Sequence, residues 1–291
     1  LISIVMATYN PTDLLENQLS AFKKQVLDPE TFEIIVVNDG STDHTAEVLS
    51  EWRKELSNLK GIYQENSGPA AARNRGVNEA IGDIIAFTDD DCVVDADWTR
   101  QILNKFAFSD INVVLGHTYT AKDHKTPLTH QIENKRWNPV VPTCNAAYRR
   151  SFFIELGGFD TSFPHPHNED TDLAWRALER GEVEYCDEMR VYHPPVPLAF
   201  SKQVQRMKML KSEFYLYKKN REGYRKWRTN SPWRTIYKEV FVMHQLRNLK
   251  FHLGFYKKPM LMMKGIALSL AWWAYLLILL PDFVSQSKEL R

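Results

Sequence analysis

The chain contains 291 residues, of which 44% are hydrophobic, 25% charged and 12% aromatic. This composition is that of a globular protein, and it excludes intrinsically disordered, collagen-like and disulfide-rich classes. The length suits one large domain or two small ones. The three cysteines, Cys92, Cys144 and Cys186, are widely spaced, which argues against a zinc knuckle or a disulfide framework and favours a reducing compartment.

The two signs of charge are separated along the chain, although the formal net charge is only +1. Residues 1–197 contain 18 Lys and Arg against 31 Asp and Glu, a net charge of −13. Residues 198–291 contain 19 Lys and Arg against 5 Asp and Glu, a net charge of +14. This asymmetry predicts an anionic partner for the basic part, either nucleic acid or a membrane surface.

Short apolar runs alternate with amphipathic stretches in the first third of the chain. We expect strands at 2–6, 32–37, 61–63 and 83–88, and helices at 14–22, 43–52 and 70–80. Nearly continuous apolar strands between helices predict an α/β fold, with a doubly wound, mainly parallel, Rossmann-like central sheet covered on both faces. In such a fold, ligands bind beyond the carboxyl ends of the strands.

The rest of the chain is less regular. We expect strands at 111–115, 144–148, 183–185 and 190–192, and helices at 151–156 and 168–179. The proline-rich residues 194–197 lie where the charge changes sign, so we place a boundary there between domains 1–197 and 198–291. The second domain should be helical, at 201–220 and 232–252, followed by the apolar segment 260–280.

Polar side chains follow three of the predicted strands: Thr8, Tyr9 and Asn10 after the first, Asp39 after the second, and Asp89, Asp90 and Asp91 after the fourth. Three adjacent carboxylates repel one another, and a divalent cation or a hydrogen-bonded ligand removes that cost. Carboxylate oxygens suit Mg²⁺ or Mn²⁺, which commonly bridge protein and substrate phosphates. The alternative interpretation is a solvated acidic turn that caps the next helix.

Other candidates are less specific on their own. Asp39 could accept hydrogen bonds from a base or ribose, and Arg73 could face the same ligand or be a surface charge. Glu169 and Asp170 lie in the first turn of a predicted helix, where the helix dipole stabilises carboxylates. A general base also needs a fixed carboxylate, so capping and catalysis are both open. His167, in a proline-rich loop, is expected to be structural.

Six motifs occur in an order that resembles the family 2 glycosyltransferases of GT-A fold. They are Thr8-Tyr9-Asn10, Asn38-Asp39-Gly40-Ser41, Ala72-Arg73-Asn74-x-Gly76, Thr88-Asp89-Asp90-Asp91, Gly157-Gly158-Phe159-Asp160 and Glu169-Asp170-x-Asp172-Leu173-x-x-Arg176. The resemblance covers about residues 1–195. It implies a metal-dependent, inverting transferase of the hexosyltransferase type, which moves a sugar from a nucleotide-diphosphate sugar to an acceptor hydroxyl.

The resemblance also implies roles for individual residues. Donor binding falls to Thr8, Tyr9, Asn10, Asp39, Arg73, Asp89, Asp90 and Arg176. Asp91 holds Mn²⁺ or Mg²⁺, with Asp89 and His193 as further metal contacts. Asp170, in the pair with Glu169, is the catalytic base that deprotonates the acceptor. Asn145, Trp137 and Trp175 are assigned to the acceptor side.

The substrates are less well defined than the reaction. UDP is the preferred nucleotide, because the base pocket resembles that of UDP-using relatives. Thr143-Cys144 stands where many members of the family have Gly-Gly, which leaves the sugar open. The acceptor could belong to a polysaccharide, a glycan, a glycolipid or a polyprenyl phosphate. A nucleotidyltransferase of similar fold is the alternative enzyme, and a membrane-bound scaffold that binds nucleotide sugars is the non-enzymatic alternative.

Residues 198–258 carry 16 Lys and Arg and 3 Glu, interleaved with aromatic residues. That mixture is typical of membrane interfaces and of nucleic-acid binding. The apolar segment 260–280 favours an anionic membrane over nucleic acid, at the cytoplasmic face. Its uncharged part, 265–280, has 16 residues, fewer than the usual ~20 of a span. A span, an in-plane helix and a buried or homo-oligomer contact therefore remain as alternatives.

Overall fold

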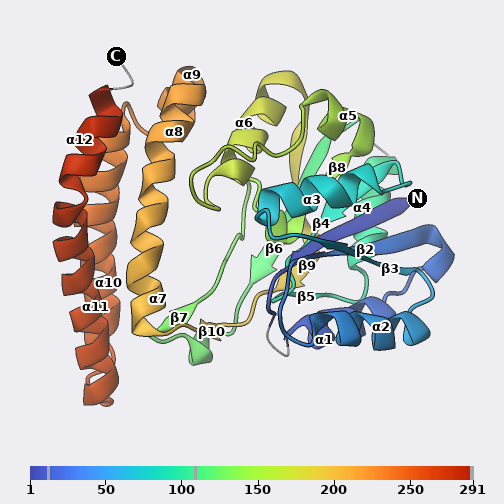
Figure 1. Ribbon diagram of the computed structural model, residues 1–291, viewed down its shortest axis with the longest axis horizontal. Coiled ribbons are helices and arrows are strands. Elements are labelled where there is room, and N and C mark those ends of the chain that lie inside the picture. The colour runs from blue at the N-terminus through green and yellow to red at the C-terminus, as the bar shows by residue number, and fades with distance from the viewer. Residues whose placement is uncertain (12–13, 108–109, 289–291) are drawn as a thin grey trace. The chain divides into compact units, whose positions relative to one another are not determined.

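The computed structural model (Figure 1) describes residues 1–11, 14–107 and 110–288. The chain forms two compact units. The first unit comprises Leu1–Thr120, Ile132–Thr161 and Glu169–Pro194, and the second comprises Ala121–Gln131, Ser162–Asn168 and the chain from Pro195 onward. Each unit is described separately below.

An eight-stranded sheet forms the centre of the first unit, in the order β3-β2-β1-β4-β8-β6-β9-β5. The strands are β1 (Ile2–Thr8), β2 (Phe32–Asp39), β3 (Leu59–Gln64), β4 (Ile84–Phe87), β5 (Val93–Val94), β6 (Val113–Tyr119), β8 (Ala146–Arg149) and β9 (Val183–Tyr192). Strands β1 to β4 are parallel to one another, as predicted. Strand β8 runs antiparallel to both β4 and β6, while β9 is parallel to β6 and antiparallel to β5.

Helices cover both faces of this sheet (Figure 1). Helices α1 (Leu14–Lys23), α2 (Thr45–Glu55) and α4 (Trp98–Ala107) pack on one face, and α3 (Pro69–Asn78), α5 (Arg150–Glu155) and α6 (Glu169–Arg180) on the other. Successive side chains of a strand point to opposite faces. Accordingly, Ile4 and Met6 of β1 join the core beneath α1, and Val5 joins the core beneath α3. Two 3-10 turns, η1 (Pro29–Thr31) and η3 (Thr143–Asn145), precede β2 and β8.

Gly76 lets α3 lie directly against β1. A Cβ atom at this position would lie 2.4 Å from Cγ1 of Val5, a distance that packed side chains do not adopt. The glycine of the Ala72-Arg73-Asn74-x-Gly76 motif is therefore a packing requirement. It brings the helix that carries Arg73 onto the central strands.

The second unit is mainly helical. It contains the strands β7 (Thr129–His130) and β10 (Val196–Pro197), which pair antiparallel. Its helices are η2 (Lys122–His124), α7 (Phe200–Gln205), η4 (Arg206–Lys211), α8 (Ser212–Lys219), α9 (Arg221–Trp227), η5 (Arg234–His244), α10 (Gln245–Leu253), α11 (Pro259–Ile278) and α12 (Leu280–Lys288). Its core consists of Leu210, Phe214, Ile236, Leu276, Leu279 and Phe283.

Several helices of the second unit differ from the predicted ones. The stretch 201–220 is divided by the 3-10 helix η4, in which residues three apart eclipse, so that Met207 and Leu210 are both buried. The stretch 232–252 begins as a π-helix, η5, and continues as α10. The apolar segment 260–280 corresponds to helix α11. This helix is long and apolar enough to cross a membrane, and 22% of its most apolar 18-residue stretch is buried inside the protein.

Candidate active site

The carboxyl ends of β1, β2 and β4 surround a cavity of about 300 Å³. Its lining consists of Ala7, Thr8, Tyr9, Asp39, Pro69, Arg73, Asp89, Asp90 and Asp91. Seven of these nine are residues that the sequence assigned to donor or metal binding. They meet because the carboxyl ends of parallel strands lie at one edge of a sheet.

Asp39 is held in place by three hydrogen bonds. Its Oδ1 accepts from the backbone N–H of Ser67 at 2.9 Å and from Nε2 of Gln64 at 2.7 Å. Its Oδ2 accepts from the backbone N–H of Gly68 at 2.9 Å. Gly68 has φ of 87°, a conformation that favours glycine. The loop after β3 thus fixes a buried carboxylate at the wall of the cavity.

Asn10 is close to this region in sequence but is not among the residues that line the cavity. It adopts φ of 45°, its backbone N–H donates to Oγ of Ser41 at 2.9 Å, and its Oδ1 accepts from the backbone N–H of Thr42 at 2.8 Å. Asn10 therefore connects the loops that follow β1 and β2. Tyr9, by contrast, lines the cavity and is 53% exposed.

Arg73 links the acidic strand end to the start of α6. Its Nη2 lies 2.8 Å from Oδ1 of Asp89, and its Nη1 lies 3.8 Å from Oε1 of Glu169. Within the described part of the chain, Nε of Arg73 and Oε2 of Glu169 are buried without a hydrogen-bond partner. Because unsatisfied buried polar atoms are costly, this pair is suited to contact a polar ligand.

Two carboxyl groups of the site have pKa values above their usual range. Burial raises the pKa of Asp90 to about 7, with a further increase from the charges of Asp91 and Asp89. The hydrogen bond that Thr8 donates to Asp90, at 2.6 Å, acts in the opposite direction. Burial and the adjacent charge of Asp170 likewise raise the pKa of Glu169 to about 7. The site therefore concentrates more negative charge than its own cations balance.

Asp91, Cys92 and His193 form a cluster whose potential ligand atoms all lie within 4.8 Å of one another. Oδ2 of Asp91 is 3.7 Å from Nε2 of His193, whose Nδ1 lies 3.0 Å from the carbonyl oxygen of Pro194. Hydrogen bonding to Cys144 and burial raise the pKa of the Cys92 thiol well above its usual value. A carboxylate with an imidazole fits Mn²⁺ or Mg²⁺.

Oδ1 of Asp89 accepts a hydrogen bond from Nη2 of Arg73 at 2.8 Å, and Asp89 is not one of the three residues of that cluster. Cys92 was not singled out from the sequence as a member of the cluster, since one cysteine beside an acidic run carries no ligand spacing. Asp170, the predicted base, is half-buried in the first turn of α6, where its Oδ1 accepts from the backbone N–H of Thr171 at 2.7 Å.

Four of the predicted residues make contacts within the protein or lie elsewhere. Arg176 donates to Asp172 at 2.7 Å and to the carbonyl oxygens of Leu156 and Gly158. Asn145 is 1% exposed, accepts from Nε1 of Trp98 at 2.9 Å and donates to the carbonyl oxygen of Met189 at 2.8 Å. Trp175 is fully buried and offers no surface to an acceptor, whereas Trp137 is 41% exposed.

Asn74 has a role that sequence reasoning did not predict. Its Nδ2 donates to the carbonyl oxygen of Phe159 at 2.7 Å, and its Oδ1 accepts from the backbone N–H of Phe159 at 2.9 Å. This pair of bonds fastens the Gly157-Gly158-Phe159 turn to α3. These bonds therefore join two of the six motifs, Ala72-Arg73-Asn74-x-Gly76 and Gly157-Gly158-Phe159-Asp160, next to Arg73.

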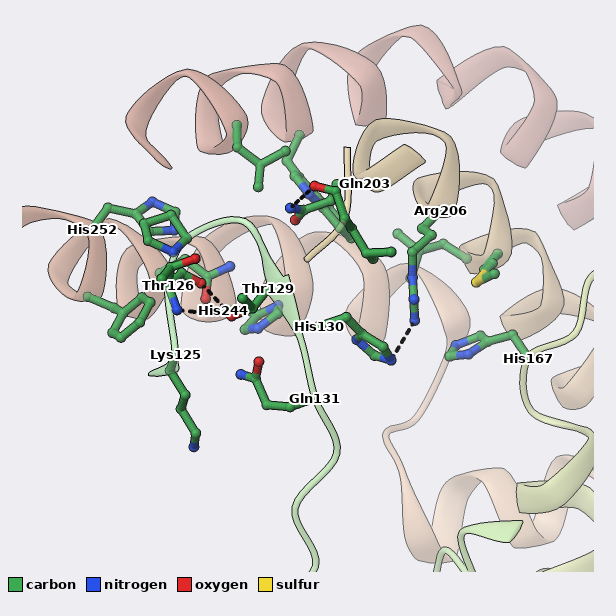
Figure 2. Close-up of a pocket in the computed structure, with 18 residues that line it drawn as sticks. Lys125, Thr126, Thr129, His130, Gln131, His167, Gln203, Arg206, His244 and His252 are labelled. Carbon is green, nitrogen blue, oxygen red and sulfur yellow. Dashed lines mark hydrogen bonds between the residues drawn. The ribbon is translucent and has the colours of Figure 1, made fainter. Parts of the chain in front are cut away.

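The second unit contains a different cavity, of about 540 Å³ (Figure 2). His130, His167, His244 and His252 line it, together with Arg206, whose Nη2 lies 3.3 Å from Nε2 of His130. No carboxylate is among the described residues of its lining. His167, expected to be structural, thus reaches a cavity wall.

Comparison with known proteins finds relatives whose names describe glycosyltransferases. The chain is 29% identical over 238 residues to "Putative glycosyltransferase EpsH" of Bacillus subtilis (strain 168), covering 75% of this chain and 67% of the relative. It is 35% identical over 221 residues to "Validoxylamine A glucosyltransferase" of Streptomyces hygroscopicus subsp. limoneus, covering 62% of this chain and 48% of the relative.

Solved structures show the same fold. S. aureus TarS 1–349 in complex with UDP has a TM-score of 0.58 at 15% identity, covering 97% of this chain and 91% of that one. The mannosyltransferase PcManGT from Pyrobaculum calidifontis, in complex with GDP-Man and Mn²⁺, has a TM-score of 0.63 at 18% identity, covering 96% and 86%. Both likenesses support the GT-A fold. The profile of the family described as "Glycosyl transferase family 2" matches residues 3–160, and the chain belongs to this glycosyltransferase family.

Proposed function

We propose that the chain transfers a sugar, with inversion, from a nucleotide-diphosphate sugar to an acceptor hydroxyl in polysaccharide, glycan or glycolipid synthesis. One observation carries the proposal: the 300 Å³ cavity that gathers Thr8, Asp39, Arg73 and the three aspartates at one edge of the sheet. Nε of Arg73 is buried there without a hydrogen-bond partner among the described residues. The phosphates of a nucleotide sugar need positively charged hydrogen-bonding groups, and Arg73 can supply one. Family membership disfavours the nucleotidyltransferase alternative.

In this proposal, Asp39 and Thr8 contact the nucleoside, and Arg73 contacts the diphosphate. Asp91 and His193 hold Mn²⁺ or Mg²⁺, which when bound supplies positive charge next to the departing diphosphate. UDP is our preferred nucleotide. TarS is solved with UDP, and also with UDP-GlcNAc, whereas PcManGT is solved with GDP-Man and Mn²⁺. Titrating UDP and GDP into the protein with Mn²⁺ present separates the two, and tighter GDP binding would contradict our assignment.

Asp170 is proposed as the general base. Its carboxylate is held at the start of α6 by the backbone N–H of Thr171, and a fixed carboxylate can remove the acceptor proton as the hydroxyl attacks. Since one base and in-line attack suffice, the product is inverted at the anomeric carbon. Oε1 of Glu169 lies 3.8 Å from Nη1 of Arg73, and we assign to Glu169 the positioning of that guanidinium next to Asp170.

Substituting Asp170→Asn tests this role. The variant should lose transfer by a factor of about 10² or more while binding the donor as the wild type does, because the amide keeps the shape but removes no proton. The matched control is Glu155→Gln, an exposed carboxylate on α5. Wild-type turnover in Asp170→Asn would exclude Asp170 as the base. Donor binding without any metal-dependent hydrolysis or transfer in the wild type would favour a scaffold instead.

We further propose that the second unit rests on an anionic membrane surface, at the cytoplasmic face. Helix α11 is packed against its own unit along one side: Trp273 donates to the carbonyl oxygen of Phe241 at 2.7 Å, and Oγ of Ser269 lies 3.2 Å from Nδ1 of His252. Its other side exposes Met260, Met263, Leu270, Leu277 and Ile278. A helix with one packed and one exposed apolar side suits an in-plane position better than an isolated span.

A further inference from the structure

A cavity of about 620 Å³ within the second unit has a strongly basic lining. Arg225, Arg228, Arg234 and Arg247 line it, and Glu239 is the one acidic residue among the described residues of the lining. The lining contains four arginines and none of the lysines nearby, although Lys226 and Lys238 are adjacent in sequence and exposed. Arg225, Arg234 and Arg247 are exposed as well, and an arginine presents a planar fork of donors that matches phosphate oxygens, which a lysine does not.

Among the residues that the structure describes, three of these four guanidinium groups have no carboxylate partner. Arg228 is balanced, because its Nη2 lies 3.3 Å from Oε1 of Glu213 and donates to Oδ1 of Asn168 at 2.5 Å. Within residues 1–11, 14–107 and 110–288, no carboxylate lies within ion-pair distance of Arg225, Arg234 or Arg247. Like charges gathered at one cavity repel one another, and a bound anion removes that cost.

Arg228 also carries an unsatisfied atom. Its Nε is buried without a hydrogen-bond partner among the described residues, while Glu213 is already bonded to the hydroxyl of Tyr224 at 2.7 Å. The protein therefore holds the Arg228 side chain in place and leaves its Nε–H without an acceptor among the described residues. A phosphate oxygen is the kind of acceptor that would use it.

The backbone of η5 brings part of this lining together. Arg234, Glu239 and His244 all line the cavity and lie five residues apart on the π-helix Arg234–His244. In an α-helix, residues five apart point about 140° away from each other, so the same sequence would scatter them. The i→i+5 hydrogen bonding of a π-helix stacks them instead, and such rare stretches are frequent at functional sites.

We propose that this arginine cavity binds a phosphate-bearing group, a diphosphate or a phosphomonoester. The guanidinium forks match pairs of phosphate oxygens, and Trp227 and Val240 supply an apolar part of the wall. The group can belong to a soluble phosphorylated compound or to a lipid headgroup. The inference depends on neither the donor nor the catalytic base, so it can fail or succeed independently of the proposed transferase mechanism.

Isothermal titration of the full chain with inorganic pyrophosphate tests the proposal, in EDTA so that no divalent cation bridges pyrophosphate to the carboxylate cavity. Arg225→Ala/Arg234→Ala should weaken binding about tenfold or more, since each charge-assisted bond is worth over 1 kcal/mol. The matched control is Lys218→Ala/Lys238→Ala, which removes two exposed charges outside the lining and should stay within about twofold. Circular dichroism checks that each variant folds.

The conservative pair Arg225→Lys/Arg234→Lys separates recognition from net charge. The lysines keep the positive charge but lack the paired donors of the guanidinium group. The affinity of this variant for pyrophosphate should therefore fall between those of the wild type and the alanine pair. Equal weakening in the alanine pair and the lysine-removal control, or no pyrophosphate binding by the wild type at low salt, would overturn the proposal. If Arg225→Ala/Arg234→Ala does not fold, wild-type affinity in the Arg→Lys pair overturns it instead.

Vesicle flotation then distinguishes the two sources of phosphate. Vesicles of phosphatidylcholine with phosphatidic acid present a phosphomonoester, and those with phosphatidylglycerol present a diester of similar charge. A lipid source predicts that Arg225→Ala/Arg234→Ala loses the preference for phosphatidic acid. A soluble source predicts that pyrophosphate binding alone is affected. Both outcomes support the site and identify its ligand.

Discussion

At the scale of single residues, Glu169 has a buried carboxylate beside a second carboxylate. Burial and Asp170 raise its pKa from an ordinary value of 4.5 to about 7, while Arg73 acts to lower it. A carboxyl group with a raised native pKa binds more protons in the native than in the unfolded state. Between pH 4.5 and 7 its contribution therefore lowers the free energy of unfolding as the pH rises.

Glu169→Gln should remove this penalty. In protein free of metal and donor, the variant should be more stable than the wild type at pH 8, by on the order of 1–3 kcal/mol, and this advantage should shrink toward pH 5. Urea unfolding at both pH values measures the difference, with Glu155→Gln as the exposed control. A stability difference that does not change with pH would show that the pKa of Glu169 is not raised in the native state.

The cluster of Asp91, Cys92 and His193 gives a second prediction at this scale. His193→Ala should weaken Mn²⁺ binding by about tenfold or more, the factor that corresponds to about 1.4 kcal/mol. Cys92→Ala should change it little, because Mn²⁺ prefers carboxylate and imidazole ligands to a cysteine sulfur. Mn²⁺ titration followed by electron paramagnetic resonance distinguishes the two variants. Equal losses would make Cys92 a ligand.

At the scale of elements, the position of the site could be predicted because the strands are parallel. The apolar runs that end at Thr8, Asp39 and Asp89 could only meet at one edge, and they do. The partners of Arg176 and Asn145 could not be predicted. Helical spacing tells which face a side chain occupies, but it does not tell that Arg176 meets the carbonyl oxygen of Gly158.

The π-helix η5 was beyond prediction for a related reason. A periodicity of 3.6 residues marks an α-helix, and a local change to i→i+5 bonding leaves no distinct pattern in the sequence. The consequence extends to function, since on an α-helix Glu239 would point about 140° away from both Arg234 and His244. Only the observed backbone turns them into the wall of one cavity.

The contact of α3 with β1 gives an element-scale prediction. Gly76→Ala should lower the free energy of unfolding by about 1–3 kcal/mol, because the new Cβ would lie 2.4 Å from Cγ1 of Val5. Gly61→Ala is the matched control, as the nearest atom to its Cβ would lie 3.7 Å away, on Leu49. Denaturation in urea compares the two. If both variants unfold alike, close packing is not what requires Gly76.

At the scale of the whole molecule, the net charge of +1 is the near-cancellation of −13 in residues 1–197 and +14 in residues 198–291. The cavity lined by Asp39, Asp89, Asp90 and Asp91 and the arginine cavity lie in different units. The two units follow these two stretches except for 121–131, 162–168 and 195–197, which belong to the second unit. Each unit therefore concentrates the charge that its proposed ligand requires: carboxylates for a metal-bound donor, and cations for an anionic surface. The net charge of the whole chain, +1, therefore hides the separation of the two signs of charge.

Membrane binding should reflect both the charge and the apolar side of α11. Replacing exposed Lys250, Lys257 and Lys258 with Gln should weaken binding to phosphatidylglycerol vesicles, by on the order of 100-fold at about 1 kcal/mol per lysine. Salt should have the same effect on the wild type. The matched control replaces Lys24, Arg53 and Arg100 of the first unit, which are also exposed.

Leu270→Asp/Leu277→Asp should reduce vesicle binding even at high salt, where only apolar insertion remains, because both leucines lie on the exposed side of α11. Sedimentation with phosphatidylcholine vesicles isolates that contribution. If the leucine variants bind as the wild type does while the lysine variants do not, the second unit binds the membrane by charge alone. Its apolar side would then be free to contact another copy of the chain, and sedimentation equilibrium of the same variants would show the change in oligomeric state.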